Sequence, residues 1–304
     1  MTPDTWSRGR QIKAELTRVR RASAGYQDMQ RLLDRYAIER FLYRLGRSRH
    51  ADQLVLKGAM LLAVYIPDAY RSTRDADFLA FGSFTPQGLK GMFTEICADE
   101  QDDGLQFDTS AITVQAAGAD REYPGYTVVV PTRLGEAACD VKMDIGFGEA
   151  VVPPAQRLSY PTILSMPEPS IRAYPLATIV AEKFQAIVGL GMSNSRMKDF
   201  HDLSEIARHC SLDGKAIQEA VQATFARRKT TIPDQTPVAL TEVFHGSRGK
   251  KADWAAFLRR HSLPKRLDLA DACADIGGFL MPVARAISAG QEFGRAWKGS
   301  RWVG

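Results

Sequence analysis

The sequence predicts an α+β fold, in which a small mixed β-sheet core follows N-terminal helices and precedes a helical C-terminal half. Apolar residues recur at helical spacing over residues 10–47 and again from residue 176 onward. Between these regions, short β-branched or alternating runs lie within residues 75–164. These runs do not alternate regularly with helices, so they indicate a mixed sheet rather than a βαβ repeat.

The first elements are two helices within residues 10–47, and Gly46 is well placed to end the second of them. An apolar run over residues 54–62 follows and contains a Lys57-Gly58 step. We expect a turn at this step that opens a short helix.

Alternating or β-branched residues mark the predicted strands, and one helix, residues 86–98, lies between the first two. The strands cover residues 75–81, 111–116, 126–130, 138–147 and 159–164. A proline-rich stretch follows, and it places a domain boundary between residues 1–165 and 166–304.

The C-terminal half is predicted to be helical throughout, without an internal repeat. The expected helices cover residues 176–190, 196–210, 214–228, 252–261 and 267–288. We expect the last one to break near Gly277-Gly278 or at Pro282.

Composition is that of an ordinary globular protein, with 45% hydrophobic and 25% charged residues among 304. The sequence contains no uninterrupted apolar run of about 20 residues and no apolar signal segment near its start, so we expect a cytoplasmic protein without a membrane partner. It also contains no Gly-x-Gly-x-x-Gly and no Walker loop, which excludes the Rossmann and P-loop classes. Its four cysteines are scattered, so they are interpreted as buried reduced thiols.

Net charge is +5, with a calculated isoelectric point near 9.0. Basic clusters of this kind track a phosphate backbone or simply form solvated helix faces, and composition alone does not separate the two. The clusters are Arg18 to Arg21, Arg227 to Lys229, Lys250-Lys251, Arg259-Arg260 and Lys265-Arg266.

Asp75 and Asp77 are the most informative residues of the chain. Alternate side chains of a strand share a face, so these two carboxylates project together, with Cα atoms roughly 6.5 Å apart. Oxygen ligands of this kind favour Mg²⁺ or Mn²⁺ over zinc. The alternative is a solvated turn.

Asp144 is the candidate for a third carboxylate. It shares a strand face with Asp140 and Lys142, opposite the apolar Val141 and Met143. The alternative is a half-exposed strand with ordinary polar residues directed outward.

A charged helical group comes later in the chain. Lys183 lies mid-helix, whereas Lys198, Asp199 and Asp202 open the next helix at spacings that let them cluster along one side. The alternative is that Lys183 is a surface residue and that Lys198 and Asp202 form a surface ion pair, which contributes only a few tenths of a kcal/mol.

Five motifs, in this order and spacing, resemble the AbiEii/AbiGii toxin family of the DNA polymerase beta-like nucleotidyltransferases. The resemblance spans about residues 30–210, and Gly58-Ala59 departs from it, since Gly-Gly or Gly-Ser is usual there. The motifs are Leu56-Lys57-Gly58-Ala59, Arg71-x-Thr73-x-Asp75-x-Asp77-Phe78, Met143-Asp144-Ile145, Ala181-Glu182-Lys183 and Arg196-x-Lys198-Asp199-x-x-Asp202-Leu203.

The resemblance implies roles for these residues. Asp75 and Asp77 would bind the Mg²⁺ that accompanies the nucleotide, and Asp144 would hold a second ion or accept the proton of the attacking hydroxyl. Asp199 and Asp202 would complete the site from the helical half and orient Lys183 or the metal ligands. The implied nucleotide-binding residues are Lys57, Gly58, Arg71, Thr73, Lys183 and Lys198.

The implied activity is transfer of a nucleoside monophosphate from an NTP to an RNA acceptor, namely the tRNA 3′ end, with pyrophosphate leaving and translation blocked. A cognate antitoxin would be the protein partner. Two alternatives stay open: transfer to a protein or small-molecule hydroxyl, and a non-catalytic nucleic-acid-binding module.

Overall fold

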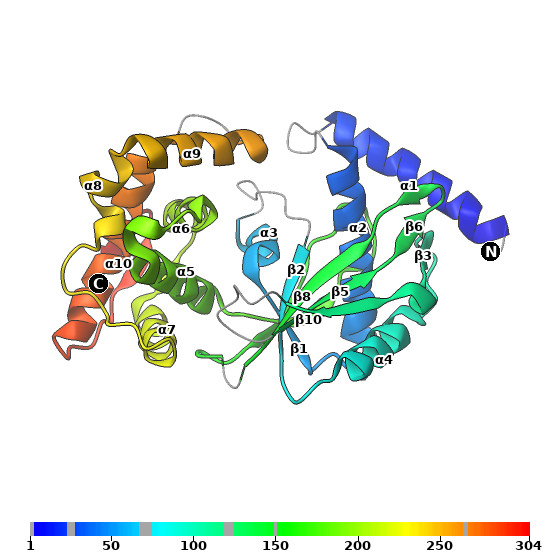
Figure 1. The fold of residues 1–304 in the computed structure, drawn as a ribbon, viewed down its shortest axis with the longest axis horizontal. Helices are drawn as coiled ribbons and strands as arrows, with labels where there is room; N and C mark the ends of the chain where they lie inside the picture. The colour runs from blue at the N-terminus through cyan, green and yellow to red at the C-terminus, as the bar shows by residue number, and fades with distance from the viewer. Residues whose placement is uncertain (1–2, 23–27, 67–74, 118–124, 149–150, 264–266) are drawn as a thin grey trace. The chain divides into compact units, whose positions relative to one another are not determined.

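The computed structural model describes residues 3–22, 28–66, 75–117, 125–148, 151–263 and 267–304 (Figure 1). The chain forms two compact units, and its path passes between them more than once. The first unit comprises Met1–Val64, Ser72–Glu149 and Gln156–Ala173, and the second comprises Tyr65–Arg71, Ala150–Ala155 and Tyr174–Gly304.

The first unit is built on a seven-stranded mixed sheet, which confirms the predicted fold class. Its strand order is β4-β5-β8-β2-β1-β10-β9, in which the β2–β8 and β1–β10 pairs are parallel and the others antiparallel. The strands are β1 Leu54–Lys57, β2 Asp75–Ala80, β4 Thr113–Ala116, β5 Gly125–Val130, β8 Val141–Phe147, β9 Gln156–Ser159 and β10 Ser170–Ala173.

The helices of this unit lie beside the sheet (Figure 1). A second, three-stranded sheet has the order β3-β6-β7. These elements are α1 Pro3–Ala22, α2 Met29–Arg47, the 3-10 helix η1 Gly58–Leu61, α3 Leu62–Tyr65 at the end of the first segment, α4 Pro86–Cys97, the 3-10 helix η3 Thr109–Ala111, β3 Leu105–Phe107, β6 Thr132–Leu134 and β7 Ala137–Ala138.

Helix α2 packs closely on the sheet at β10. The expectation that Gly46 ends this helix is wrong, because α2 continues to Arg47. Gly46 serves the packing instead: a Cβ at this position would collide with the backbone oxygen of Ser170. Burial of Arg44 in α2 is compensated by a bidentate ion pair with Asp103, in which Nη1 lies 2.5 Å from Oδ2.

Two predicted strands differ from the structure. The predicted strand 138–147 is interrupted, because β7 ends at Ala138 and β8 begins at Val141. The predicted strand 159–164 is wrong: β9 ends at Ser159, two residues before Pro161. Proline lacks the N–H that a strand interior requires, which accounts for the end of pairing here.

The second unit is mainly helical, as expected, and holds a three-stranded sheet in the order β11-β12-β13. Its further elements are α5 Leu176–Leu190, η4 Gly191–Ser193, α6 Met197–His209, β11 Leu212–Asp213, α7 Gly214–Arg227, η5 Val238–Leu240, α8 Glu242–His245, α9 Arg248–Arg260, α10 Leu269–Ser288, β12 Ala296–Lys298 and β13 Arg301–Val303.

Helix α10 has no break where one was predicted. It runs through Gly277, Gly278 and Pro282, and ten of its side chains are buried. Tertiary packing of an apolar face therefore outweighs the local preference of these residues to interrupt a helix.

Helix α5 and the turn after it, Leu176–Ser193, have the length and composition of a membrane span, but 61% of this segment is buried. Such burial is what the core helix of a globular unit shows.

All four cysteines are free and buried, as predicted, and burial raises the pKa of Cys97 to about 12.

Candidate active site

Four polar side chains form one row across the middle of the large sheet. Lys57 on β1 pairs in register with Asp77 on β2, Asp77 with Asp144 on β8, and Asp144 with Thr127 on β5. Register partners on neighbouring strands point to the same face and lie about 4.8 Å apart. The sheet therefore brings Asp77 and Asp144 together, as well as Lys57, as the resemblance implied.

The opposite face of the same strands supplies the reason for this arrangement. Ala76 and Phe78 alternate with the two aspartates of β2, and Met143 and Ile145 alternate with the polar residues of β8. All four of these apolar side chains are fully buried. Burying them fixes the register, so the carboxylates are held on the other face.

Gly58 is required at the edge of this row. Its φ is +75°, a left-handed conformation that favours glycine, and a Cβ at this position would collide with Asp77 Oδ2. The backbone after Lys57 thus runs directly against the Asp77 carboxylate. The neighbouring Ala59 is buried, so the departure from the family motif lies on the core side of this turn.

Lys57 reaches across the row toward β8. A Cβ at Gly146 would lie 3.6 Å from Lys57 Nζ, which places the ammonium group over this part of β8. Gly146 lies two residues after Asp144 and shares its face. Lys57 thus places a positive charge beside the carboxylates, where an anionic substrate would need it.

Asp75 and Asp144 each have a neighbour that the sequence did not indicate. Lys142 Nζ lies 3.4 Å from Asp75 Oδ1, and both of these side chains are half-exposed. The Thr127 hydroxyl donates a hydrogen bond of 2.7 Å to Asp144 Oδ1. Among the residues that the structure describes, no three His, Cys, Asp or Glu side chains converge to hold a metal ion as they stand.

The second unit contains a buried ionic cluster on α5 and α6. Lys183 Nζ lies 3.0 Å from Asp199 Oδ1 and 2.8 Å from Asp202 Oδ2, and both aspartates are fully buried. Arg196 Nε lies 2.7 Å from Asp199 Oδ2. The surface alternative is therefore wrong for Lys183 and Asp202, which are buried, and Lys198 is exposed.

Electrostatics keep the Asp199 carboxylate ionised within this cluster. Burial alone would raise its pKa, but the charges of Lys183 and Arg196 outweigh that effect and lower the pKa. His201 Nδ1 lies 3.3 Å from Asp202 Oδ1, and its ring packs against Trp254 and Phe257. His201 is thus a structural residue of the cluster.

Two of the predicted nucleotide-binding residues, Arg71 and Thr73, lie outside the residues that the structure describes. Thr127, Lys142 and Arg196 also lie near the predicted residues, although the sequence assigned none of them a role. Thr127 occupies an ordinary strand position, so only the pairing of β5 with β8 reveals its contact.

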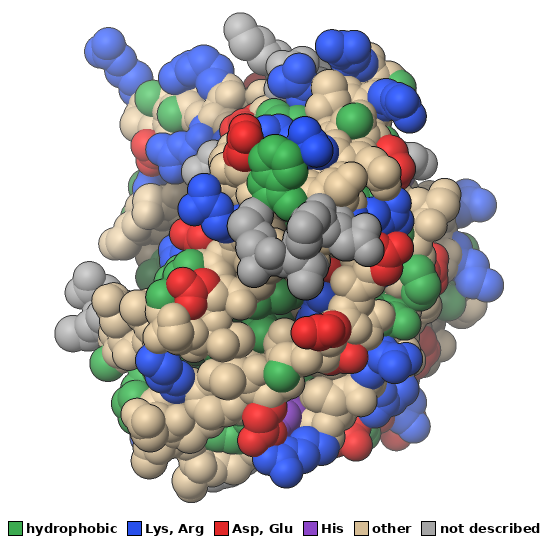
Figure 2. Space-filling model, turned by 90° about the vertical axis from the view of Figure 1, so that its right-hand side faces the viewer, with side chains coloured by type: hydrophobic (Ala, Val, Ile, Leu, Met, Phe, Trp, Pro, Cys, Tyr) green, Lys and Arg blue, Asp and Glu red, His purple; other side chains and the backbone are tan. Residues whose placement is uncertain are grey.

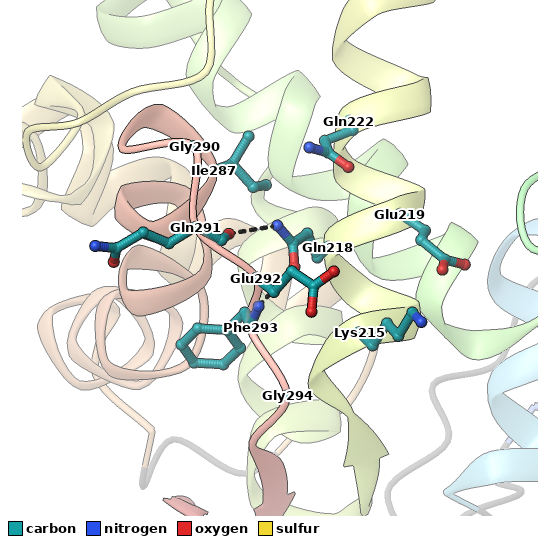
Figure 3. Close-up of a pocket in the computed structure, with 10 residues that line it drawn as sticks. All are labelled: Lys215, Gln218, Glu219, Gln222, Ile287, Gly290, Gln291, Glu292, Phe293 and Gly294. Carbon is teal, nitrogen blue, oxygen red and sulfur yellow. Dashed lines mark hydrogen bonds between the residues drawn. The ribbon is translucent and has the colours of Figure 1, made fainter.

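A pocket elsewhere in the second unit has a volume of about 340 Å³ and is lined by α7, the end of α10 and the segment after it (Figure 3). Gln218 joins the two walls: its Nε2 donates to the Gln291 oxygen, and its Oε1 accepts from the Phe293 N–H, each at 2.8 Å. None of the predicted site residues lines this pocket, so it stands apart from the chemistry.

Comparison with known proteins decides the family. The sequence profile described as nucleotidyl transferase AbiEii toxin, type IV TA system, matches residues 40–275. The chain belongs to this family. It is a nucleotidyltransferase toxin of a type IV toxin–antitoxin system, which implies an NTP substrate and an antitoxin partner. No curated protein is detectably similar to the chain in sequence.

Solved structures share the fold of this AbiEii-family chain. MenT4, a nucleotidyltransferase toxin from Mycobacterium tuberculosis, has a TM-score of 0.54 at 17% identity, covering 90% of this chain and 98% of its own. JHP933 from Helicobacter pylori has a TM-score of 0.51 at 13% identity, covering 86% and 95%. A putative nucleotidyltransferase from H. pylori has a TM-score of 0.51 at 12% identity, covering 88% and 100%.

Proposed function

We propose that this toxin is a metal-dependent enzyme that transfers a nucleoside monophosphate from an NTP to RNA, with the 3′ end of tRNA as the acceptor, and thereby blocks translation in the cytoplasm. The observation that carries the proposal is the row of Lys57, Asp77 and Asp144, which sets two carboxylates and a cation on one face of adjacent strands. Phosphoryl transfer needs mainly positioning and charge neutralisation, and this row supplies groups for both.

The donor set fits a hard divalent cation such as Mg²⁺ or Mn²⁺. Carboxylate oxygens are the ligands these ions prefer, and Asp77 and Asp144 offer them from neighbouring positions. Asp75 would become a third carboxylate ligand if its ion pair with Lys142 opened. When bound, the metal would neutralise phosphate charge.

The chain's own residues would divide the remaining work. Lys57 would bind the triphosphate, together with Arg71 and Thr73 from the motif that follows it in the sequence. The attacking hydroxyl forms a bond to the α-phosphorus while the bond to the β-phosphate oxygen breaks, and pyrophosphate leaves. Asp144, oriented by Thr127, would accept the proton of that hydroxyl or bind a second ion.

Lys183, Lys198, Asp199 and Asp202 keep the roles that the family motifs imply. Two carboxylates hold the Lys183 ammonium at hydrogen-bond distance. This arrangement supports the proposal that Asp199 and Asp202 orient Lys183 for nucleotide binding.

Replacing the central carboxylate tests the proposal. Asp77→Ala should abolish incorporation of labelled NMP into tRNA, with each of the four NTPs, while leaving the melting curve close to that of the natural chain, because Asp77 is half-exposed. Retained transfer would contradict the assignment. Label appearing in a protein lysate but not in tRNA would favour a protein acceptor instead.

A further inference from the structure

Helix α9 of the second unit has an unusual charge balance. It carries five basic residues and one acidic residue, and no acidic residue in its first turn. Arg248 and Lys251 lie in or next to that turn, where the helix dipole disfavours positive charge by about 0.3–1 kcal/mol each. The stability of the helix therefore does not explain why Arg248 and Lys251 are at these positions.

Only one of the basic residues at this end has a structural function. Lys250 donates from Nζ to the Asn194 oxygen at 2.7 Å and lies 5.1 Å from the centre of the Phe244 ring. The side chains of Arg248, Lys251 and Arg259 are exposed, and among the described residues none of them has an ion-pair or hydrogen-bond partner.

These three side chains share one side of α9, which we call the cationic face. At 100° per residue, Arg248, Lys251 and Arg259 fall within about 80° of arc and span about 16 Å along the axis. Ala252 and Ala255 lie between them on the same side, so no bulky side chain separates the cations.

The helix that carries this face is firmly held. Trp254, Phe257 and Leu258 are buried, and Trp254 Nε1 donates to the Leu267 oxygen at 3.0 Å. Ser247 caps the N-terminus by accepting from the Lys250 N–H. The cations are therefore presented from a rigid backbone, so binding has to order only their side chains.

Several exposed arginines of the first unit are instead paired with carboxylates. Arg49 pairs with Glu95 at 2.6 Å, and Arg157 with Asp52 at 2.8 Å. On the face shown in Figure 2, basic side chains are interspersed with acidic ones. A linear set of unpaired cations differs from this pattern and is complementary to evenly spaced negative charges.

We infer that the cationic face of α9 binds the phosphate backbone of RNA. The inference rests on the proposed function, since an enzyme that modifies RNA must hold a polyanion. Unpaired arginine and lysine on one helix side match consecutive phosphates without reading sequence. The face would thus contribute affinity for RNA rather than choice of nucleotide.

The test compares two triple variants that remove the same charge. The first is Arg248→Gln, Lys251→Gln and Arg259→Gln, which keeps helix propensity. The control is Arg47→Gln, Arg49→Gln and Arg157→Gln, whose arginines are exposed but paired with Asp99, Glu95 and Asp52. Binding of bulk tRNA is measured without NTP or metal between 50 and 200 mM salt, after melting curves confirm folding.

The first variant should lower the slope of log affinity against log salt by about two, at roughly 0.7 per lost phosphate contact, and the control should retain the natural slope. Equal slopes in both variants, loss in the control alone, or no tRNA binding by the natural chain would overturn the inference. Binding of poly-glutamate, a polyanion without phosphate, is measured in the same way. A first variant that loses binding of poly-glutamate but keeps binding of tRNA would also overturn the inference. Failure of NMP transfer would affect only the proposed function, because binding is measured separately.

Discussion

The side chain of Asp144 illustrates how one neighbouring residue orients a proposed catalytic group. Its Oδ1 accepts a 2.7 Å hydrogen bond from the Thr127 hydroxyl on the adjacent strand. A hydrogen bond to a charged group contributes about 1.5–3 kcal/mol, and it also fixes the direction of the carboxylate. Thr127 is therefore a positioning residue for Asp144.

Thr127→Val should slow NMP transfer about tenfold, because the variant keeps the β-branched shape but loses the donor, and about 1.4 kcal/mol corresponds to a tenfold rate change. The measurement is the rate of labelled NMP incorporation over a titration of Mg²⁺. Thr127→Ser retains a hydroxyl and should restore most of the rate. A Thr127→Val enzyme as fast as the natural one, or a serine variant as slow as the valine variant, would refute the role.

At the scale of elements, α5 and α6 are joined by the pair of Lys183 and Asp199. The Asp199 pKa is lowered in the folded chain, because burial is outweighed by Lys183 and Arg196. A carboxylate with a lowered folded pKa adds stability above its unfolded pKa of about 3.9 and loses that contribution as the pH falls through the folded pKa. The contact between these helices should therefore weaken in acid.

Asp199→Asn should reduce the free energy of unfolding at pH 7 by about 3–5 kcal/mol, since it leaves buried cations without their partner. The difference from the natural chain should narrow as the pH falls below about 4. Urea unfolding of both chains at a series of pH values measures the loss of free energy at pH 7 and its decrease in acid. Asp253→Asn removes an exposed carboxylate of α9 and should have little effect at any pH, and an equal effect of the two variants would contradict the ionic explanation.

The longer elements were predictable from the sequence, and the short strands were not. Residues 75–81 and 126–130 have the alternation of strands, and β2 and β5 lie there. β1, β9 and β10 contain four residues each and lie beside turns or prolines, so their pattern is too short to read. The three strands complete the sheet on the Lys57 side of the row.

The candidate site was predictable as a set of residues but not as a geometry. Alternation indicates that Asp75 and Asp77 share one face, yet it cannot show that β2 pairs in parallel with β8 and sets Asp77 beside Asp144. Helical spacing likewise left Lys183 with a surface alternative. Burial decides that question, and burial depends on contacts between segments distant in the sequence.

At the scale of the whole molecule, the second unit includes short segments from earlier in the chain. The Tyr65 hydroxyl donates to the Tyr174 oxygen at 3.1 Å, and the Thr178 hydroxyl donates to the Val152 oxygen at 3.0 Å. Ile66 and Val151 are also buried. A boundary drawn once along the sequence, such as 165/166, therefore separates residues that pack in the same unit.

The isolated fragment of residues 174–304 should thus unfold at lower urea concentration than the second unit does within the full chain, because it lacks these bonds and burial of each apolar side chain contributes about 1.5–3 kcal/mol. Trp254, Trp297 and Trp302 all lie in this unit, so tryptophan fluorescence of a Trp6→Phe full chain reports on it alone. Tyr65→Phe with Thr178→Val in that chain should shift the transition part of the way toward the fragment. A fragment that unfolds at the same urea concentration as the full chain would show that the earlier segments contribute nothing to the unit.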